Sequence, residues 1–325
     1  MKLLQKALNK FNGLHYSQEY LCLAKEPFEH PLHLYFISNN RVIKDISYQH
    51  LFVGYSPLIF ALPQFVEIDQ AHLHNISILF TSKTLAINEI VSKKDAIATL
   101  ELKQIHQEAA DNDTIYFYEG VKGIHHFVSP FHQLILSLNN KLFNKKPGNV
   151  FLPGNLYEQV QIAYSIPRKI SLITVKQNNL FNLFPTDLHG EISENRYLIS
   201  LRQGGKAAQQ TDATMKILLS DVRADFYKTV YSLGKNHMQE PKGKETFPFS
   251  NALSEKFGLP LPEQTLCYRE LEVIDSFIHG IHKIFILKTL SNARTADIPS
   301  TLAHVHNIYA TWRYNKGLGG NYLLR

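Results

Sequence analysis

Residues 196–213 read RYLISLRQGGKAAQQTDA, and this stretch indicates both a fold and a candidate binding site. Successive side chains of an extended backbone point to opposite faces, so in the first seven residues Leu198, Ser200 and Arg202 share one face, opposite Tyr197, Ile199 and Leu201. The pair Gly204–Gly205 interrupts the strand, and good helix formers follow over Lys206–Ala213. We therefore predict a strand, a tight turn and a short helix.

The turn between this strand and helix has the composition of a phosphate site. Backbone N–H groups at the glycines lie beside two cations, Arg202 and Lys206. A lysine in the first turn of a helix faces the positive end of the helix dipole, which costs about 0.3–1 kcal/mol unless an anion is bound there. Two interpretations stay open, a phosphate cradle and a pair of solvated charges around an ordinary turn.

The common nucleotide-binding motifs do not fit this turn. A P-loop requires glycine where Ser200 stands and a hydroxyl side chain where Ala207 stands. The G-x-G-x-x-G fingerprint of a Rossmann fold is also absent from the sequence. The sequence therefore does not favour a fold of either class.

The rest of the second half contains β-rich segments separated by turn residues, which predicts a small barrel with one or two helices. His279 and Gly280 are placed to reverse the last two strands. The polar segment Asn236–Asn251 is predicted to be a long surface loop that lies over a site. The predicted strands span residues 169–176, 196–202, 216–222, 265–274 and 281–290.

The segment Asn178–Asp187 follows the first of these strands and is predicted to be a loop. Its amide and hydroxyl groups suit hydrogen bonds to a flat heteroaromatic ring, while Phe181 and Phe184 cover apolar surface. The alternative interpretation is an Asn-rich turn anchored by two buried phenylalanines.

The first half mixes helices and strands. A helix is predicted over Ser92–Ala110, because Ser92 is a suitable N-cap and apolar residues recur at helical spacing. A second is predicted over Phe131–Asn144, whose leucines recur every four residues, and Pro- and Gly-containing residues 145–154 form a boundary. Short strands are predicted over residues 32–38, 77–81 and 114–119.

In their order along the chain, the segments of the second half resemble the flavin reductase-like FMN-binding split barrel family. The likeness covers about half of the chain and does not include residues before about 158. Ile166–Thr174 resembles the opening strand of the family, and Asn182–Thr186 resembles its Asn-x-x-Pro-x-Ser stretch beside the flavin ring. The strand that ends at Arg202 resembles the segment that meets the FMN phosphate, and Gly280–His282 is similar to a Gly-Asp-His turn.

The resemblance implies an α+β chain in two parts. A mixed α/β N-terminal domain of unknown role, residues 1–155, would precede a flavin reductase-like, FMN-binding split β-barrel, residues 156–325. It further implies non-covalent FMN, NADH or NADPH as electron donor, small-molecule donors and acceptors, and a homodimer.

The resemblance also implies roles for particular residues. Arg202 and Lys206 would pair with the phosphate through charge-assisted hydrogen bonds. His282 would be the catalytic residue, on the nicotinamide or substrate side. Ile281 departs from the aspartate of the family's turn, which indicates altered or weaker FMN binding. The predicted cofactor-binding residues are Asn182, Thr186, Asp187, Ser200, Arg202 and Lys206.

Composition limits the remaining classes. With 44% apolar and 19% charged residues among 325, the chain is globular, and two distant cysteines indicate a reducing compartment, so we predict a cytoplasmic protein. No secretory signal is visible around Lys2, Lys6 and Lys10, and the apolar stretches are too short to cross a membrane. The net charge of +6 is spread along the chain, which does not favour a nucleic-acid partner.

Other chemistries receive little support from the sequence. His72 with His74, His304 with His306, and the cluster His125, His126 and His132 supply too few placed ligands, so we predict no metal site. A G-x-S-x-G elbow is absent, which disfavours a hydrolase. Tyr309 and Trp312 are interpreted as packing for a late helix or a dimer contact. The alternative function is a non-catalytic sensor or interaction protein that binds a flavin or another phosphate-bearing ligand.

Overall fold

The computed structural model of the chain describes residues 13–16, 18–24, 28, 30–64, 75–92, 94–110, 113–143, 150–295 and 300–323. The N-terminal lysines, His72, His74 and residues 145–148 of the expected boundary lie outside this part. The chain divides into two compact units. The first contains residues 1–21, 28–166 and 305–320, and the second contains residues 22–27, 167–304 and 321–325.

The first unit is built on a seven-stranded antiparallel sheet in the order β3-β2-β6-β7-β8-β5-β4. The strands predicted over 32–38, 77–81 and 114–119 all fall within strands of this sheet. Its members are β2 (His33–Ser38), β3 (Arg41–Asp45), β4 (Leu51–Tyr55), β5 (Leu58–Pro63), β6 (Ser77–Thr81), β7 (Ala98–Ala110) and β8 (Asp113–His125).

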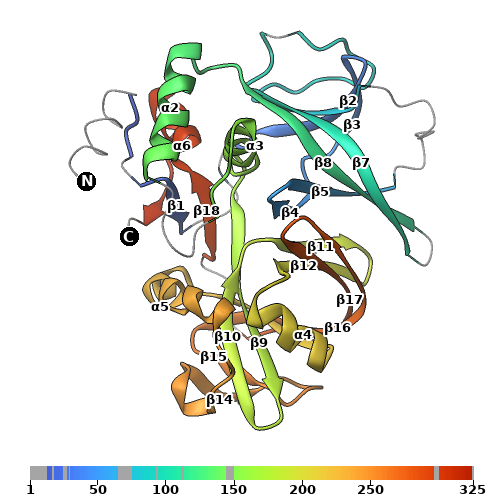
Figure 1. Ribbon diagram of the computed structural model, residues 1–325, viewed down its shortest axis with the longest axis vertical. Helices are drawn as coiled ribbons and strands as arrows, with labels where there is room; N and C mark the ends of the chain where they lie inside the picture. The colour runs from blue at the N-terminus through green and yellow to red at the C-terminus, as the bar shows by residue number, and fades with distance from the viewer. Residues whose placement is uncertain are drawn as a thin grey trace. The chain divides into compact units, whose positions relative to one another are not determined.

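Helices α2 (Pro130–Phe143), α3 (Asn155–Ala163) and α6 (Asn307–Asn315) complete the first unit (Figure 1). Helix α3 lies against β8 at Gly123, whose N–H donates to Asn155 Oδ1 at 2.7 Å. A Cβ at Gly123 would lie 3.0 Å from the Cα of Gln159, so glycine permits this close approach of helix and strand. The predicted helix over 131–144 is confirmed as α2.

The helix predicted over Ser92–Ala110 is wrong. Residues 98–110 form the long strand β7, which pairs with both β6 and β8. Leu100 and Leu102 are buried while Glu101 and Lys103 are exposed, which is the two-residue period of a strand. The Ser92 hydroxyl accepts from Lys94 N at 3.3 Å and so stabilises a local turn instead of a helix.

The second unit is a mainly antiparallel sheet in the order β11-β12-β17-β16-β13-β9, with β10 and β18 both paired to β9. All five strands predicted for the second half are found, and the helix predicted over 206–213 is α4. A closed split barrel stays a prediction. The elements are β9 (Arg168–Gln177), β10 (Leu180–Thr186), β11 (His189–Ser193), β12 (Arg196–Arg202), α4 (Lys206–Thr214), β13 (Lys216–Val222), β16 (Thr265–His279), β17 (His282–Arg294) and β18 (Leu302–His306).

The segment Asn178–Asp187 is not a loop, as predicted, but a hairpin turn and the strand β10. Asn178 adopts a φ of 56° in the turn, a conformation that asparagine tolerates. Pro185 fits within β10 because this strand pairs only with β9 and so lies at a sheet edge. The predicted burial of Phe181 and Phe184 is confirmed, at 8% and 0% exposed.

Apolar side chains cover both faces of this sheet, which fixes the position of α4. On one face Leu172, Leu183 and Leu218 belong to one core cluster, and on the other Ile173 and Leu219 pack with Ala207 and Ala208 of α4. Two small alanines let the helix approach the sheet closely. The cores therefore hold the start of α4 beside the end of β12.

The segment predicted as a long loop over Asn236–Asn251 contains short ordered elements. They are the end of η3 (Leu233–Met238), η4 (Lys244–Thr246) and the start of β14 (Phe249–Leu253), which pairs with β15 (Pro260–Pro262). η3 follows α5 (Tyr227–Ser232) and packs on β10 and α4.

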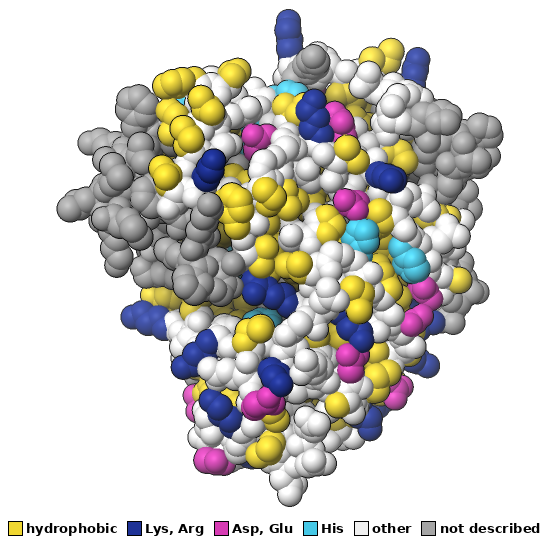
Figure 2. All heavy atoms as spheres, viewed as in Figure 1, with side chains coloured by type: hydrophobic (Ala, Val, Ile, Leu, Met, Phe, Trp, Pro, Cys, Tyr) yellow, Lys and Arg dark blue, Asp and Glu magenta, His cyan; other side chains and the backbone are white. Residues whose placement is uncertain are grey.

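The surface mixes charges instead of concentrating them. On the face shown in Figure 2, Lys and Arg side chains are scattered among Asp and Glu, and hydrophobic side chains gather over α2. The exposed large hydrophobic residues of α2 are Phe131, Leu134, Leu138 and Leu142. Among the described helices, none has both the length and the apolar character needed to cross a bilayer.

Candidate functional site

The turn after β12 is held against the β16–β17 hairpin. Gly205 N donates to Arg202 O at 2.9 Å and closes the turn. Gln203 ties the turn to the neighbouring hairpin twice, because its N–H donates to Ile281 O at 3.0 Å and its Nε2 donates to Gly280 O at 2.9 Å. The candidate phosphate turn and the predicted Gly280–His282 turn therefore form one structure.

Ser200, Arg202 and His282 come together on the adjacent strands β12 and β17. Arg202 and His282 are direct cross-strand partners. Ser200 Oγ and His282 Nδ1 are hydrogen-bonded at 3.1 Å, and both side chains are buried. Burial lowers the pKa of His282 to about 4, and the positive charge of Arg202 contributes to the shift. The imidazole is therefore neutral at pH 7.

Lys206 lies at the start of α4, where its Nζ is 2.6 Å from Glu240 Oε1. The two side chains are 41% and 69% exposed, and an exposed ion pair of this kind contributes about 0–1 kcal/mol. An anion that arrives at the turn can therefore compete with Glu240 for Lys206. Ahead of Gly204 the space is open, since a Cβ there would meet nothing within 4 Å.

Asn182 lies under η3 with a side chain that is 1% exposed. Its Nδ2 donates to Gln210 Oε1 at 2.7 Å and to Asn236 O at 3.1 Å. Its Oδ1 is buried and has no hydrogen-bond partner among the described residues. Nearby in β10, Thr186 Oγ1 accepts from Leu188 N at 3.3 Å, so this hydroxyl supports the chain turn after the strand.

Asp187 belongs to a hydrogen-bonded chain of three side chains. His304 Nδ1 donates to Asp187 Oδ2 at 2.7 Å, and the Tyr231 hydroxyl donates to His304 Nε2 at 2.6 Å. All three side chains are partly buried. Asp187 is thus held at the end of β10 by contacts within the second unit.

His237 is a residue of the site that the sequence did not single out. Its Nε2 lies 2.6 Å from Pro185 O, and because a carbonyl only accepts, this nitrogen carries the proton. Burial lowers the pKa of His237, while its bond to Pro185 and the charge of Asp187 oppose the shift and that of Arg202 adds to it. The predicted loop over 236–251 was the signal that could have found it.

The structure therefore gathers most of the predicted residues around the ends of β10 and β12. Arg202 and Asp187 both act electrostatically on His237, and Arg202 also acts on His282. Two cations and an open glycine turn fit a phosphate-bearing ligand. Asn182 differs from the rest, since η3 covers it and its amide nitrogen is engaged within the protein.

His304 and His306 bond to different partners. His304 contacts Asp187 and Tyr231, whereas His306 Nδ1 accepts from Ile308 N at the start of α6. His125 is buried between Tyr309 and Gln161, at 3.0 and 3.1 Å. Among the described residues, no group of three His, Cys, Asp or Glu side chains could hold a metal ion.

No protein-family model matches the chain. No curated protein matches it either.

Part of the chain is similar to solved structures of flavin reductases and FMN-binding proteins. An FMN-binding protein from Thermus thermophilus is 18% identical, with a TM-score of 0.36, over 39% of this chain and 71% of that protein. An NADH:FAD oxidoreductase from Streptomyces globisporus is 16% identical, with a TM-score of 0.41, over 50% and 95%. The styrene monooxygenase flavin reductase of Pseudomonas putida S12 is 15% identical, with a TM-score of 0.36, over 42% and 87%.

Proposed function

We propose that this chain is an FMN-binding flavoprotein and an oxidoreductase of flavin reductase type, which passes electrons from NADH or NADPH through FMN to a small-molecule acceptor. The observation that carries the proposal is the arrangement of Arg202, the open Gly204 turn and Lys206 beside Ser200 and His282. In this proposal the phosphate of FMN occupies that turn. The N-terminal domain, the homodimer and a cytoplasmic location belong to the same proposal.

The charges at the turn support a dianionic phosphate. Arg202 offers a planar guanidinium that can bind two oxygens at once, and Lys206 offers a point charge whose ion-pair partner, Glu240, is itself exposed. The N–H groups at the start of α4 carry the positive end of the helix dipole, which favours an anion. In this proposal Thr186 and Asp187, at the end of β10, hold the ring system or ribityl chain of FMN, away from the phosphate.

The flavin supplies the hydride-transfer chemistry, and the protein supplies position and electrostatics. Since His282 is neutral at pH 7 and 1% exposed, it keeps Ser200 and the Arg202 strand in place without adding a second cation beside the guanidinium. Protonation of His282 would put two positive charges on cross-strand neighbours. A catalytic contact of His282 with the nicotinamide or substrate stays a prediction from the resemblance.

The first test compares flavin retention in two double variants. Arg202→Ala with Lys206→Ala removes both cations at the turn and is expected to abolish retention of FMN through gel filtration. Arg196→Ala with Lys288→Ala removes two cations from the opposite end of the same strand pair, where Arg196 and Lys288 are cross-strand partners. This control is expected to retain FMN as the unaltered protein does. Equal occupancy in both variants would refute the phosphate assignment.

The second measurement follows the flavin absorption band under anaerobic addition of NADH and of NADPH. Bleaching of a retained band is the result expected for a reductase. A band that is retained and stays oxidised with both donors would favour the sensor alternative. No flavin binding to the unaltered protein would refute the proposal that FMN is the ligand.

A further inference from the structure

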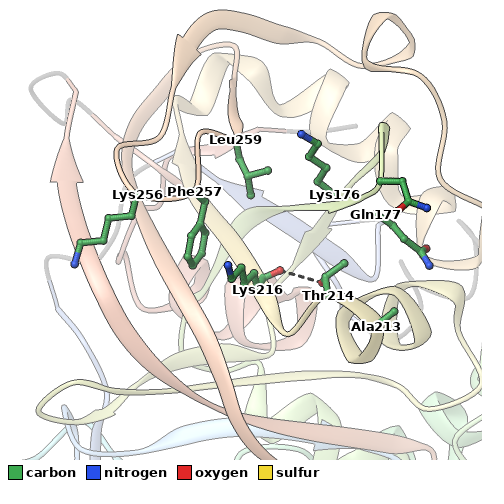
Figure 3. A pocket seen from close by; sticks show the side chains of 9 residues that line it. Lys176, Gln177, Ala213, Thr214, Lys216, Lys256, Phe257 and Leu259 are labelled. Atoms are coloured by element: carbon green, nitrogen blue, oxygen red, sulfur yellow. Dashed lines mark hydrogen bonds between the residues drawn. The ribbon is translucent and has the colours of Figure 1, made fainter.

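A second hollow lies in the second unit at the other end of α4 from Lys206 (Figure 3). Its volume is about 440 Å³, within the range of small-molecule sites. The turn between β9 and β10, the end of α4, the start of β13 and the segment before β15 contribute to its wall. Among the described residues that line it are three lysines, Lys176, Lys216 and Lys256, and no carboxylate.

Two of these lysines lie near the ends of neighbouring strands that border the hollow. The pairing of β9 with β13 ends at Thr174 and Leu218, two residues short of Lys176 and Lys216. The direct cross-strand partner of Lys176 is Phe181, and that of Lys216 is Glu272. Neither lysine forms an ion pair with any described residue, so neither charge is neutralised by a contact within the described part of the chain.

The positions of the three ammonium groups differ. Lys216 extends toward Phe257, with its Nζ 5.3 Å from the ring centroid, and Lys176 lies across the hollow with its Nζ 5.6 Å from the ring of Phe181 (Figure 3). Lys256 points away, and its Nζ donates to Leu290 O at 2.6 Å. Two cations therefore face the hollow beside an aromatic ring, and a third lies at its rim.

The end of α4 does not cancel this charge. Ala213 and Thr214 bring the negative end of the helix dipole to the wall, which is equivalent to roughly half an elementary charge. Three full positive charges outweigh it. All three lysines are exposed, so an anion binds them without first breaking a buried contact.

We propose that this hollow binds an organic diphosphate, with its phosphates between Lys176 and Lys216 and its ring against Phe257. Lysine is a common phosphate ligand in proteins, and a diphosphate would neutralise the positive charge that the lysines bring to the hollow. Phe257 and Leu259 supply the apolar wall for the organic part. The proposal does not depend on FMN at the turn near Lys206, which lies at the opposite end of α4.

The test is calorimetric titration of the full chain, saturated with FMN, with ADP and separately with pyrophosphate. Lys176→Gln with Lys216→Gln is expected to weaken ADP binding by about tenfold or more. The control variant Lys228→Gln with Lys288→Gln removes two exposed lysines outside the hollow and is expected to bind as the unaltered protein does. Phe257→Leu is expected to weaken binding of ADP and to leave that of pyrophosphate unchanged.

A third variant separates this site from the flavin turn. Arg202→Ala with Lys206→Ala, without FMN, is expected to bind ADP as tightly as the unaltered protein. This measurement tests the ADP site even if FMN does not bind at the turn near Lys206. No binding of ADP at millimolar concentration would overturn the inference. Equal ADP affinity in the Lys176/Lys216 variant and its control would also overturn it.

Discussion

The turn after β12 leaves room for a side chain at one glycine and not at the next. A Cβ at Gly205 would lie 3.1 Å from Arg202 O and 3.2 Å from His237 O, both backbone atoms, whereas a Cβ at Gly204 would meet nothing within 4 Å. The crowded atoms belong to the two segments that carry the candidate site. At the residue scale, the site therefore depends on close backbone approach as well as on charged side chains.

Gly205→Ala is expected to destabilise the protein by about 1–3 kcal/mol, since a buried backbone contact must shift to admit the methyl group. It is also expected to weaken FMN binding, because Arg202 and His237 both move. Gly204→Ala is the matched control and is expected to change stability by less than about 0.5 kcal/mol. Chemical unfolding and flavin retention measure both effects. Equal stability of the two variants would contradict the close packing at Gly205.

At the scale of elements, local patterns predicted the second half of the chain well and the first half less well. The alternation in 196–202 and the helix formers after Gly205 are local signals, and both elements form as predicted. Residues 92–110 carry apolar positions that suit either period, and pairing with β6 and β8, which is not local, makes them a strand. The strand β10 was missed for the same reason, because its amides and proline resemble a turn until β9 pairs with it.

The residues of the candidate site also divide into those that local sequence patterns predict and those that only non-local packing brings there. Ser200, Arg202, Lys206 and His282 follow from strand alternation, a glycine pair and a hairpin. His237 and Glu240 come from a segment without a periodic pattern, and only the packing of η3 on β10 brings them to the site. A sequence pattern marks that segment as polar but does not give the backbone path that places a particular imidazole.

The strand assignment of β7 can be tested by substitution. Leu102→Ala is expected to destabilise the protein by about 2–5 kcal/mol, as Leu100→Ala is, because both side chains lie on the buried face of the strand. Lys103→Ala is expected to be nearly neutral. A helix would instead place residues 100 and 103 on one face. A large loss of stability on Lys103→Ala and none on Leu102→Ala, measured by urea unfolding, would contradict the strand.

At the scale of the whole molecule, both units contain histidines that are buried and neutral. Burial lowers the pKa of His125 to about 3 in the first unit, and those of His189 and His282 to about 4 in the second. An unfolded chain binds protons at these residues below pH about 6.5, while the folded chain does not. Each therefore contributes stability near neutral pH that is lost as the pH falls.

The free energy of unfolding is expected to decrease between pH about 6.5 and about 4, by about 3 kcal/mol for each of these histidines. Urea unfolding at a series of pH values, followed by circular dichroism, measures the slope. His282→Gln is expected to reduce this decrease in the free energy of unfolding by about 3 kcal/mol, the contribution of one histidine. A free energy of unfolding that stays constant across this range would contradict the neutral, buried state of the three imidazoles.

The division of each unit among separate stretches of the chain has a consequence for the order of biosynthesis. Residues 28–166 leave the ribosome early, but Tyr309, the partner of His125 in the first unit, is translated only after residues 167–304 of the second. Until Tyr309 has been synthesised, the His125 imidazole of the nascent first unit therefore lacks its hydrogen bond to the Tyr309 hydroxyl. Any chaperone that holds the growing chain would meet that unfinished surface before it meets a completed protein.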